Sequence, residues 1–429
     1  DEPVALGVDP ETLVCLQALQ SEFGNLVSVD KPNGRKAYFI NDADEVRKLL
    51  VKHHSRYKKG PGFERVKMLL GNGLIVSDGE TWRRSRRMIQ PAFTRQNIHR
   101  LIGLMVECAE ERASVWGKVA AAGETLDITQ EMSDFALELI LRCIFGADYE
   151  THILNAGENP FAFLSKDSER NLRIVLQVRE SRNLIMSVIN DRRARDTEEE
   201  FDFLSMYMSA TDKGGEGFSD DELLDELVTL IVAGYETSAG TLNWAWYLAA
   251  RNQDAEAKLL AEARKLFHDA STINQEALAE AVYGQQFLEE TLRLYPPVWL
   301  FSRRAIEDDA LQDYDVAEGT DIYLSPYILH RTEEYWPNPD HFDPDRFGPD
   351  CPHKKGDRPY FPFSLGPRRC LGEYFSFLEM KVHLGLLIQQ FHMTLESDQE
   401  PELDLGINLR TKNSIIVRPH LRAQESEIV

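Results

Sequence analysis

Cysteine is scarce in this chain, with 5 residues among 429, and no two of them form a C-x-x-C pair. An odd count without paired spacing argues against a disulfide framework and against a zinc or iron–sulfur site. It indicates a reducing compartment, so we expect a cytoplasmic protein. The five residues are Cys15, Cys108, Cys143, Cys351 and Cys370.

Basic residues are outnumbered by acidic ones. The chain has 48 Lys and Arg against 71 Asp and Glu, which gives a formal net charge of −23 at pH 7. A strongly acidic chain is repelled by nucleic-acid phosphates and is kept dispersed in water by its charge. The balance therefore argues against a nucleic-acid partner and favours solubility.

Long apolar runs are almost absent, and the one candidate is residues 227–250. Glu236 and Asn243 lie within it, which favours a buried core helix over a membrane span. No signal peptide or stable membrane anchor is visible. The chain begins at Asp1 without a Met, so an N-terminal segment, including an anchor, could have been trimmed. Nothing repeats, and no reductase-like extension follows Val417.

The most informative stretch runs from Phe363 to Gly372, where a single cysteine, Cys370, lies between two glycines. An apolar helical pattern follows to Phe391, so we expect Cys370 at or just before a helix N-terminus. There the helix dipole and unpaired N–H groups favour a thiolate, which can bind one metal ion as a soft ligand. A cysteine considered alone would more often be a buried structural residue.

The spacing Phe-x-x-Gly-x-Arg-x-Cys-x-Gly of this stretch resembles the haem-binding signature of the cytochrome P450 family. The resemblance implies that Cys370 ligates the iron of haem b, iron protoporphyrin IX. It also implies that Arg368 binds a haem propionate and that Phe363 packs beside the sulfur. Gly366 and Gly372 would allow a tight turn and a close approach of the backbone to the cofactor.

A second motif lies in an arginine-rich predicted helix. Trp82 and Arg86 are four residues apart and share a helical face. They resemble the family's Trp-x-x-x-Arg motif, which implies that both bind a haem propionate. Arg83, Arg84 and Arg87 fall on other faces, and we expect them to form a docking patch for an acidic redox partner. An exposed arginine-rich helix without a function would have the same sequence.

A third motif lies in the middle of the long apolar helix, at Ala233–Ser238. We expect Gly234 to thin the helix there, and Thr237 to bond back to a carbonyl one turn earlier and bend it. The stretch resembles the family's oxygen-activation motif. It implies that Glu236 and Thr237 deliver protons during catalysis, whereas a core helix with a satisfied threonine is the plainer alternative.

A fourth motif pairs Glu290 with Arg293, three residues apart on one helical face. It resembles the family's Glu-x-x-Arg motif, and Arg346 within Phe342–Phe347 resembles its third member. The implied role is structural, namely to fix the loop that carries Cys370. An isolated Glu/Arg pair at this spacing is otherwise a surface salt bridge.

The resemblance covers residues 27–417 and implies a mainly α fold with a small β-rich part, with haem between the long helix and the cysteine-bearing helix. We expect one domain over residues 1–429, and for residues 56–74 we expect loop with short helical turns. A turn at Pro32-Asn33-Gly34 should join the first two strands. The expected β-rich part is formed by residues 24–41, 298–324 and 403–418.

The remaining site residues are implied only by their positions in the family's sequence pattern. Arg303 would reach a haem propionate, although Arg304 is a rival. Residues 70–75 resemble the corresponding segment of fatty-acid hydroxylating members, which suggests a fatty acid or terpenoid substrate. The residues implied to line the substrate cavity are Ala233, Val298 and Leu300.

The implied function is a haem-thiolate monooxygenase that inserts one atom of O2 into an apolar organic substrate. Electrons would come from a separate ferredoxin, flavodoxin or reductase, and the protein would be a monomer. A peroxide-using hydroxylase or a hydroperoxide-rearranging enzyme would share Cys370 but would not need Glu236 and Thr237. A non-catalytic haem sensor or carrier also fits Cys370, and NAD(P)H-dependent product formation would exclude it.

Overall fold

The structure is a computed structural model that describes residues 6–31, 34–154, 159–166, 172–195, 200–349, 351 and 358–423. The described residues form two compact units. Unit 1 comprises the chain up to Val66, Gln286–Cys370 and Glu400–Asn413. Unit 2 comprises Lys67–Gln285, Leu371–Gln399 and the chain from Ser414 onward. The single domain expected from the sequence remains a prediction.

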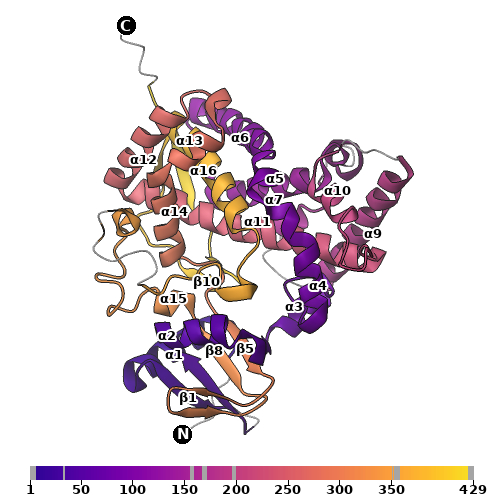
Figure 1. Ribbon diagram of the computed structural model, residues 1–429. Helices are drawn as coiled ribbons and strands as arrows, with labels where there is room; N and C mark the ends of the chain where they lie inside the picture. The colour runs from indigo at the N-terminus through magenta and orange to yellow at the C-terminus, as the bar shows by residue number, and fades with distance from the viewer. Residues whose placement is uncertain are drawn as a thin grey trace. The chain divides into compact units, whose positions relative to one another are not determined.

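Unit 1 is built on a five-stranded sheet with the strand order β1-β2-β8-β5-β3. Strands β2 and β8 run parallel, and the other neighbours are antiparallel. Helices α1 (Pro10–Phe23) and α2 (Ala43–Arg47) lie beside this sheet (Figure 1). Its strands are β1 (Leu26–Asp30), β2 (Lys36–Ile40), β3 (Tyr57–Lys59), β5 (Phe301–Ala305) and β8 (Asp321–Leu324).

Short elements complete unit 1, and apolar side chains from the sheet and from α2 and η1 form its core. Two hairpins pair β6 with β7 and β10 with β11. The remaining strands are β6 (Asp309–Leu311), β7 (Tyr314–Val316), β10 (Leu403–Leu405) and β11 (Leu409–Thr411). The helices are α1 (Pro10–Phe23), α2 (Ala43–Arg47), η1 (Lys48–Lys52), η2 (His54–Arg56), α15 (Pro326–Leu329), η6 (Pro344–Phe347) and η7 (Gly366–Arg368).

Unit 2 is helical around α11 (Asp220–Arg251), which packs along α7 (Ile128–Phe145) and also contacts α16 (Glu373–Gln390) (Figure 1). A capping box starts α11: Ser219 accepts the N–H of Glu222 at 3.3 Å, and Glu222 accepts the N–H of Ser219 at 2.9 Å. Rings of Trp116, Trp246 and His383 meet in the core.

The other long helices of unit 2 are α6 (Ile102–Ala122), α7 (Ile128–Phe145), α9 (Leu172–Arg195), α12 (Gln253–Leu266) and α16 (Glu373–Gln390). Its shorter elements are α4 (Gly79–Ile89), η3 (Gln90–Phe93), α5 (Arg95–His99), η4 (Tyr149–Ile153), α8 (Phe163–Lys166), α10 (Phe203–Met208), η5 (Ala270–Thr272) and α13 (Gln275–Glu280). Helices α3 (Phe63–Leu70) and α14 (Val282–Leu294) contain residues of both units. Strand β12 (Ile416–Leu421) lies between β4 (Leu126–Asp127) and β9 (Phe391–Leu395).

The mainly α fold with a small β-rich part is confirmed, but the strand inventory differs from the expectation. Residues 56–74, expected as loop with short helical turns, contain the strand β3 and the eight-residue helix α3 with loop between and after them. The range 403–418 is divided between the β10–β11 hairpin of unit 1 and β12 of unit 2. Of the turn expected at residues 32–34, Pro32 and Asn33 lie outside the described residues.

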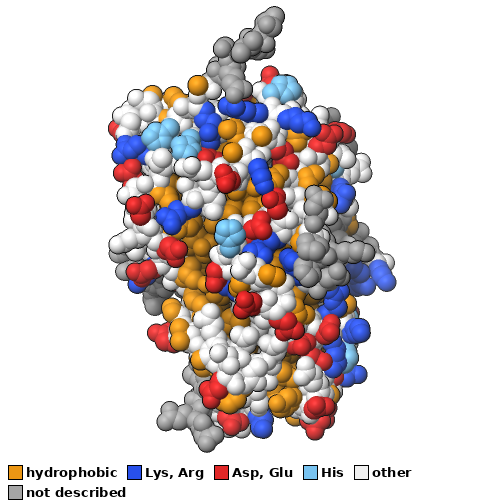
Figure 2. Space-filling model, turned by 90° about the vertical axis from the view of Figure 1, so that its left-hand side faces the viewer, with side chains coloured by type: hydrophobic (Ala, Val, Ile, Leu, Met, Phe, Trp, Pro, Cys, Tyr) orange, Lys and Arg blue, Asp and Glu red, His pale blue; other side chains and the backbone are white. Residues whose placement is uncertain are grey.

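The long apolar stretch is the middle of α11, as expected of a core helix. Across the part of the chain that the structure describes, no helix has the length and hydropathy to cross a bilayer. On the face shown in Figure 2, acidic and basic side chains are intermixed.

Candidate active site

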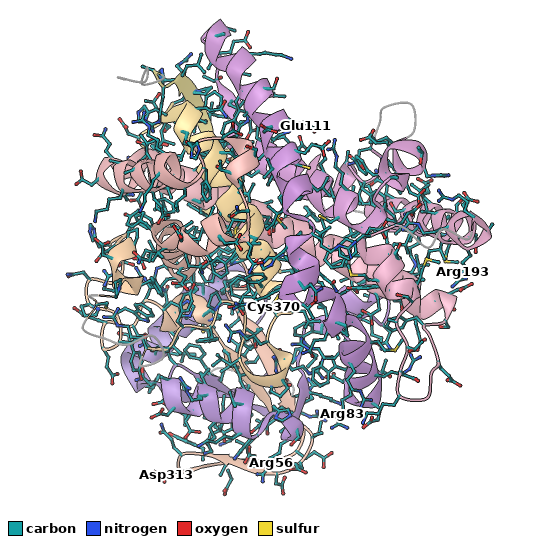
Figure 3. The ribbon with its side chains drawn as sticks, turned by 45° about the horizontal axis from the view of Figure 1, so that its top comes forward. Arg56, Arg83, Glu111, Arg193, Asp313 and Cys370 are labelled. Atoms are coloured by element: carbon teal, nitrogen blue, oxygen red, sulfur yellow. The ribbon has the colours of Figure 1, made fainter. Side chains whose placement is uncertain are left out.

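The cysteine loop of unit 1 is held by hydrogen bonds within its own backbone. Ser364, with φ of 62°, donates its N–H to the carbonyl of Phe361 at 2.9 Å. The N–H of Cys370 donates to the carbonyl of Phe363 at 2.9 Å. The Cys370 side chain is exposed, and Figure 3 shows it on the chain ahead of α16. Because α16 begins at Glu373, Cys370 lies just before a helix N-terminus, as predicted.

The two glycines of the signature differ in what they require. Gly366 has φ of +68°, and a Cβ there would overlap the carbonyl oxygen of Leu50, so only glycine fits. Gly372 is the N-cap residue of α16 with φ of −79°, a conformation that any residue adopts. The backbone conformation therefore requires glycine at position 366 but does not require it at position 372.

Next to this loop, unit 1 has a small hollow with a cationic lining. No acidic residue lines it, and its charged members are two arginines and two lysines. Such a surface attracts carboxylates, and the arginine forks can bind them through two hydrogen bonds each. The lining residues are Leu49, Leu50, His54, Tyr57, Lys58, Lys59, Arg303 and Arg368.

The structure distinguishes Arg303 from its rival Arg304. Arg303 is 6% exposed and lines the hollow. Arg304 donates its Nε–H to Asp321 Oδ1 at 2.7 Å, in a pair across β5 and β8. Arg304 is thus engaged by Asp321 and is not among the residues that line the hollow. Arg303 is therefore the one placed to meet a carboxylate.

Asp309 is hydrogen-bonded to Tyr57, one of the residues that line the hollow. It accepts the hydroxyl of Tyr57 at 2.8 Å and the Arg56 guanidinium at 2.7 Å, and it contacts His53 Nδ1 at 2.8 Å. Although burial alone would raise the pKa of Asp309, the hydrogen bonds with His53 and Tyr57 hold it below its usual value. The carboxylate fixes Tyr57 in the wall of the hollow, and sequence reasoning did not single out any of these residues.

The described residues of unit 1 fit a haem. An exposed cysteine, a soft ligand for iron, lies two residues after Arg368 in the chain. Arg303 and Arg368 line one hollow and are suited to carboxylate groups such as propionates. Phe363, on the same loop, is partly exposed. This donor set matches a cofactor that combines iron with anionic substituents.

The two apolar residues expected to line the substrate cavity in unit 1 differ in burial. Val298 is partly buried and packs against the core of the sheet. Leu300 is 5% exposed, immediately before β5. Their role in binding a substrate remains a prediction.

In unit 2, the predicted propionate-binding residues Trp82 and Arg86 lie on α4, one turn apart and both partly exposed. Between them, Ser85 is buried. The amphipathic helix thus has one face directed into the unit and a second, arginine-rich face. Their binding of a propionate remains a prediction.

Arg84 does not belong to an exposed patch, which corrects the expectation. Its guanidinium donates to Asp212 Oδ2 at 2.8 Å and to Glu222 Oε1 at 2.9 Å. The pKa of Arg84 is raised, first because of its hydrogen bond to Asp212. It ties α4 to the start of α11, so only Arg83 and Arg87 of the three are exposed.

The acid–alcohol pair, Glu236 and Thr237, lies in the middle of α11, and both side chains are partly exposed. Thr237 donates its hydroxyl to the carbonyl of Ala233 at 2.9 Å, the back-bond that the sequence predicts. Gly234 has a different role from the expected one. A Cβ there would lie 2.8 Å from Ile140 Cγ1, so the glycine allows close packing against α7.

Ser238, the last residue of this motif, faces away from the pair. Its hydroxyl donates to Glu379 of α16, and both residues are buried. Burial raises the pKa of Glu379 to about 8, although the Ser238 hydrogen bond opposes the shift. This contact joins α11 to α16 within unit 2, and no pattern in the sequence indicates it.

The Glu290 network forms in unit 1. Arg293 donates to both Glu290 oxygens, at 2.6 and 2.8 Å, and Arg346 Nε lies 3.3 Å from Glu290 Oε1. The N–H of Asp343 also donates to Glu290, at 2.9 Å. Glu290 and Arg293 are both fully buried, so this is not a surface salt bridge.

Two acids of α11 that sequence reasoning missed contact the segment before α4. Asp225 accepts the N–H of Asn72 at 2.6 Å, and Glu226 accepts the N–H of Leu74 at 2.9 Å. Burial raises the pKa of Glu226 to about 7, while hydrogen bonds from Leu74 and Ser85 oppose the shift. The signal available in the sequence was an acidic pair at the start of an otherwise apolar helix.

Comparisons with known proteins identify the family of the chain. The family model described as Cytochrome P450 matches residues 6–417. The chain is 31% identical to cyclooctatin synthase of Streptomyces melanosporofaciens, over 86% of this chain and 83% of that one. It is 28% identical to pentalenene oxygenase of Streptomyces avermitilis, over 89% and 86%. It is 29% identical to cytochrome P450 4F6 of Rattus norvegicus, over 82% and 72%.

The fold is similar to that of the haem domain of cytochrome P450DA, with a TM-score of 0.86 and 24% identity, over 97% of this chain and 93% of that one. The chain is thus an oxidoreductase that uses haem iron, and it belongs to the cytochrome P450 family. Proteins of this family are monooxygenases that act in general on apolar substrates and receive electrons from separate redox partners.

Proposed function

We propose that this protein is a haem-thiolate monooxygenase whose iron ligand is Cys370. The observation that carries the proposal is the exposed cysteine on a loop whose Arg368 lines a cationic hollow together with Arg303. In this proposal the cofactor is haem b, and Trp82 and Arg86 also bind its propionates. The haem supplies oxygen activation at its iron when it is bound.

The chain's own residues then have separate roles. Glu236 and Thr237 hold and pass protons through a carboxylate and a hydroxyl on the partly exposed face of α11. Glu290, Arg293 and Arg346 fix the fold of the chain that leads to the cysteine loop.

The proposed substrate is a small apolar molecule, a terpenoid or a fatty acid. Two relatives are named for cyclooctatin and pentalenene. The side chains proposed to contact the substrate, those of Ala233, Val298 and Leu300, are all apolar. A ligand screen that follows the Soret shift of the holoenzyme tests this class, and binding of polar ligands alone would contradict it.

The proton-delivery role predicts an uncoupled enzyme when the alcohol is removed. Thr237→Ala should bind haem and consume NAD(P)H, because only one hydroxyl is lost. Its product yield per NAD(P)H should fall at least about tenfold, with peroxide as the main product, because general acid–base contributions are about 10²–10⁴-fold. The measurement is the stoichiometry of NAD(P)H, peroxide and product.

A matched control lies one turn further along α11. Thr241 donates its hydroxyl to the carbonyl of Thr237 at 2.8 Å and is buried. Thr241→Ala should keep the coupling, and so should Thr237→Ser. If Thr237→Ala retains the wild-type stoichiometry, the pair does not control protons. Turnover of the wild type with peroxide alone would instead favour a peroxide-using enzyme.

The electron donor is proposed to be an acidic ferredoxin or flavodoxin that docks on Arg83 and Arg87. Both side chains are exposed on α4, and Arg83 has a single described ion pair, with Glu80. Opposite charges across an interface mainly raise the association rate and are screened by salt. Arg83→Glu/Arg87→Glu should therefore slow reduction about tenfold at low salt and flatten its salt dependence.

Stopped-flow reduction by a ferredoxin at rising ionic strength measures this effect. Arg193→Glu is the control, since Arg193 is exposed on α9, well separated from Arg83 (Figure 3). The control should keep wild-type kinetics. Equal rates for the double variant and wild type at low salt would exclude α4 as the docking surface.

A further inference from the structure

The segment Gly71–Leu74, between α3 and α4, is held on α11 by two carboxylates. The N–H of Asn72 donates to Asp225 Oδ2 at 2.6 Å, and the N–H of Leu74 donates to Glu226 Oε2 at 2.9 Å. Hydrogen bonds from backbone N–H groups to ionised carboxylates are stronger than neutral ones. We call Asp225 and Glu226 the acidic clamp.

Two glycines allow this segment to lie close to α11. Gly71 has φ of +78°, and a Cβ there would overlap the carboxylate of Asp225. A Cβ on Gly73 would overlap the hydroxyl of Thr229. The backbone of the segment therefore lies directly against α11, with no side chain between them.

The clamp lies on the same face of α11 as the proposed catalytic residues. Successive side chains turn by about 100°, so Glu226, Thr229, Ala233 and Thr237, at spacings of three and four, share one face. From Thr229 to Ala233 the rise along the axis is about 6 Å. The clamped segment thus ends about one helical turn from the residue proposed to contact substrate.

Glu226 also links this segment to α4. Besides Leu74, it interacts with Ser85, and Glu226 is only 3% exposed. A buried carboxylate needs such partners, because an unpaired buried charge is costly. One side chain therefore sets the position of the segment relative to both α11 and α4.

We propose that Asp225 and Glu226 are positioning residues that set ligand selectivity by fixing the backbone of Gly71–Leu74 beside the substrate face of α11. The inference rests on the proposed function, since it concerns the same ligand site. A wall held by two carboxylates excludes ligands that a mobile wall would admit. Removing both carboxylates should leave the iron ligand intact and relax the discrimination between ligands of different length.

The test uses the holoenzyme with the variant Asp225→Ala/Glu226→Ala. Hydrogen exchange at the Asn72 and Leu74 amides should accelerate about tenfold, because both lose their acceptors. Selectivity is measured with alkylimidazoles, from 1-methylimidazole to 1-dodecylimidazole, whose nitrogen binds haem iron and shifts the Soret band. In the variant, the ratio of the dissociation constants of the short and long ligands should move about fivefold towards one, because the discrimination is relaxed.

Three controls separate the clamp from its surroundings. Asp225→Asn/Glu226→Gln keeps the acceptor oxygens and should restore protection and selectivity. Arg182→Ala removes the ion pair of Arg182 with Asp225, at 2.7 Å, and should leave the Asn72 amide protected. Asp220→Ala changes an exposed acid in the first turn of the same helix and should have no effect on either readout.

Two results would overturn the proposal. If the amides of Asn72 and Leu74 stay protected in the double variant, the carboxylates do not hold the segment. If the amides open and the alkyl-chain ratio stays that of wild type, the segment does not set selectivity. Should the double variant not fold, Asp225→Ala and Glu226→Ala singly give the same two readouts. Neither readout needs turnover, so a failure of the monooxygenase proposal would be seen separately, as absence of O2-dependent product.

Discussion

Arg293→Ala is expected to destabilise the protein by roughly 3–5 kcal/mol, which is the cost of removing one partner from a buried ion pair. The variant leaves Glu290 fully buried with its main counter-charge gone. It also removes the donor to the carbonyls of His330 and Pro339, at 2.9 and 2.7 Å. A loss of this size is a large part of a typical total stability of about 5–15 kcal/mol.

The measurement is thermal unfolding followed by circular dichroism, together with haem content after purification. Arg293→Lys keeps the charge but not the planar fork, so its loss should be intermediate. The matched control is Arg193→Ala, which breaks an exposed Arg–Asp pair with Asp220 and should cost about 0–1 kcal/mol. Equal unfolding of Arg293→Ala and the control would show that the network does not hold this part of unit 1.

The features that the sequence predicted well are local. The cysteine loop and the Thr237 back-bond depend on residues within ten positions of one another, so their spacing carries the geometry. The same holds for the Glu290–Arg293 pair, at three residues. A helix or a tight turn brings such residues together whatever the rest of the chain does.

The features that were missed are contacts between distant parts of the chain. Ser238 and Glu379 are 141 residues apart, and Asn72 and Asp225 are 153 apart. No periodicity within either segment indicates its partner. The short strands β3 and β4 were missed for the same reason, since two or three residues become a strand only when a partner strand pairs with them.

Two predictions depended on which neighbouring element a residue faces, and residue spacing alone does not determine this. Arg303 and Arg304 alternate in β5, and it is the pairing of Arg304 with Asp321 that leaves Arg303 for the hollow. Gly234 was expected only to thin the helix, and the position of Ile140 shows that it allows a close contact between helices. Only the packing of the neighbouring strand or helix shows which of the two alternatives is correct.

Replacement of the proposed iron ligand has the other large expected effect. In Cys370→His an imidazole nitrogen stands where a thiolate would push electron density onto the iron. Cys370 is exposed and its backbone N–H is bonded within its own loop, so the substitution should leave the fold intact. Monooxygenase turnover should be lost while thermal unfolding stays close to that of wild type. Cys351→Ser, at another cysteine of unit 1, is the control and should retain activity.

The most direct test of the account is the absorption spectrum of the reduced, carbon monoxide-treated protein. Wild type should show the far-red-shifted Soret band that thiolate ligation produces, and Cys351→Ser should show it too. Cys370→His should bind haem and carbon monoxide without that band. A wild-type protein that lacks the band, or a Cys370→His variant that keeps it, would contradict the assignment of Cys370 as the iron ligand.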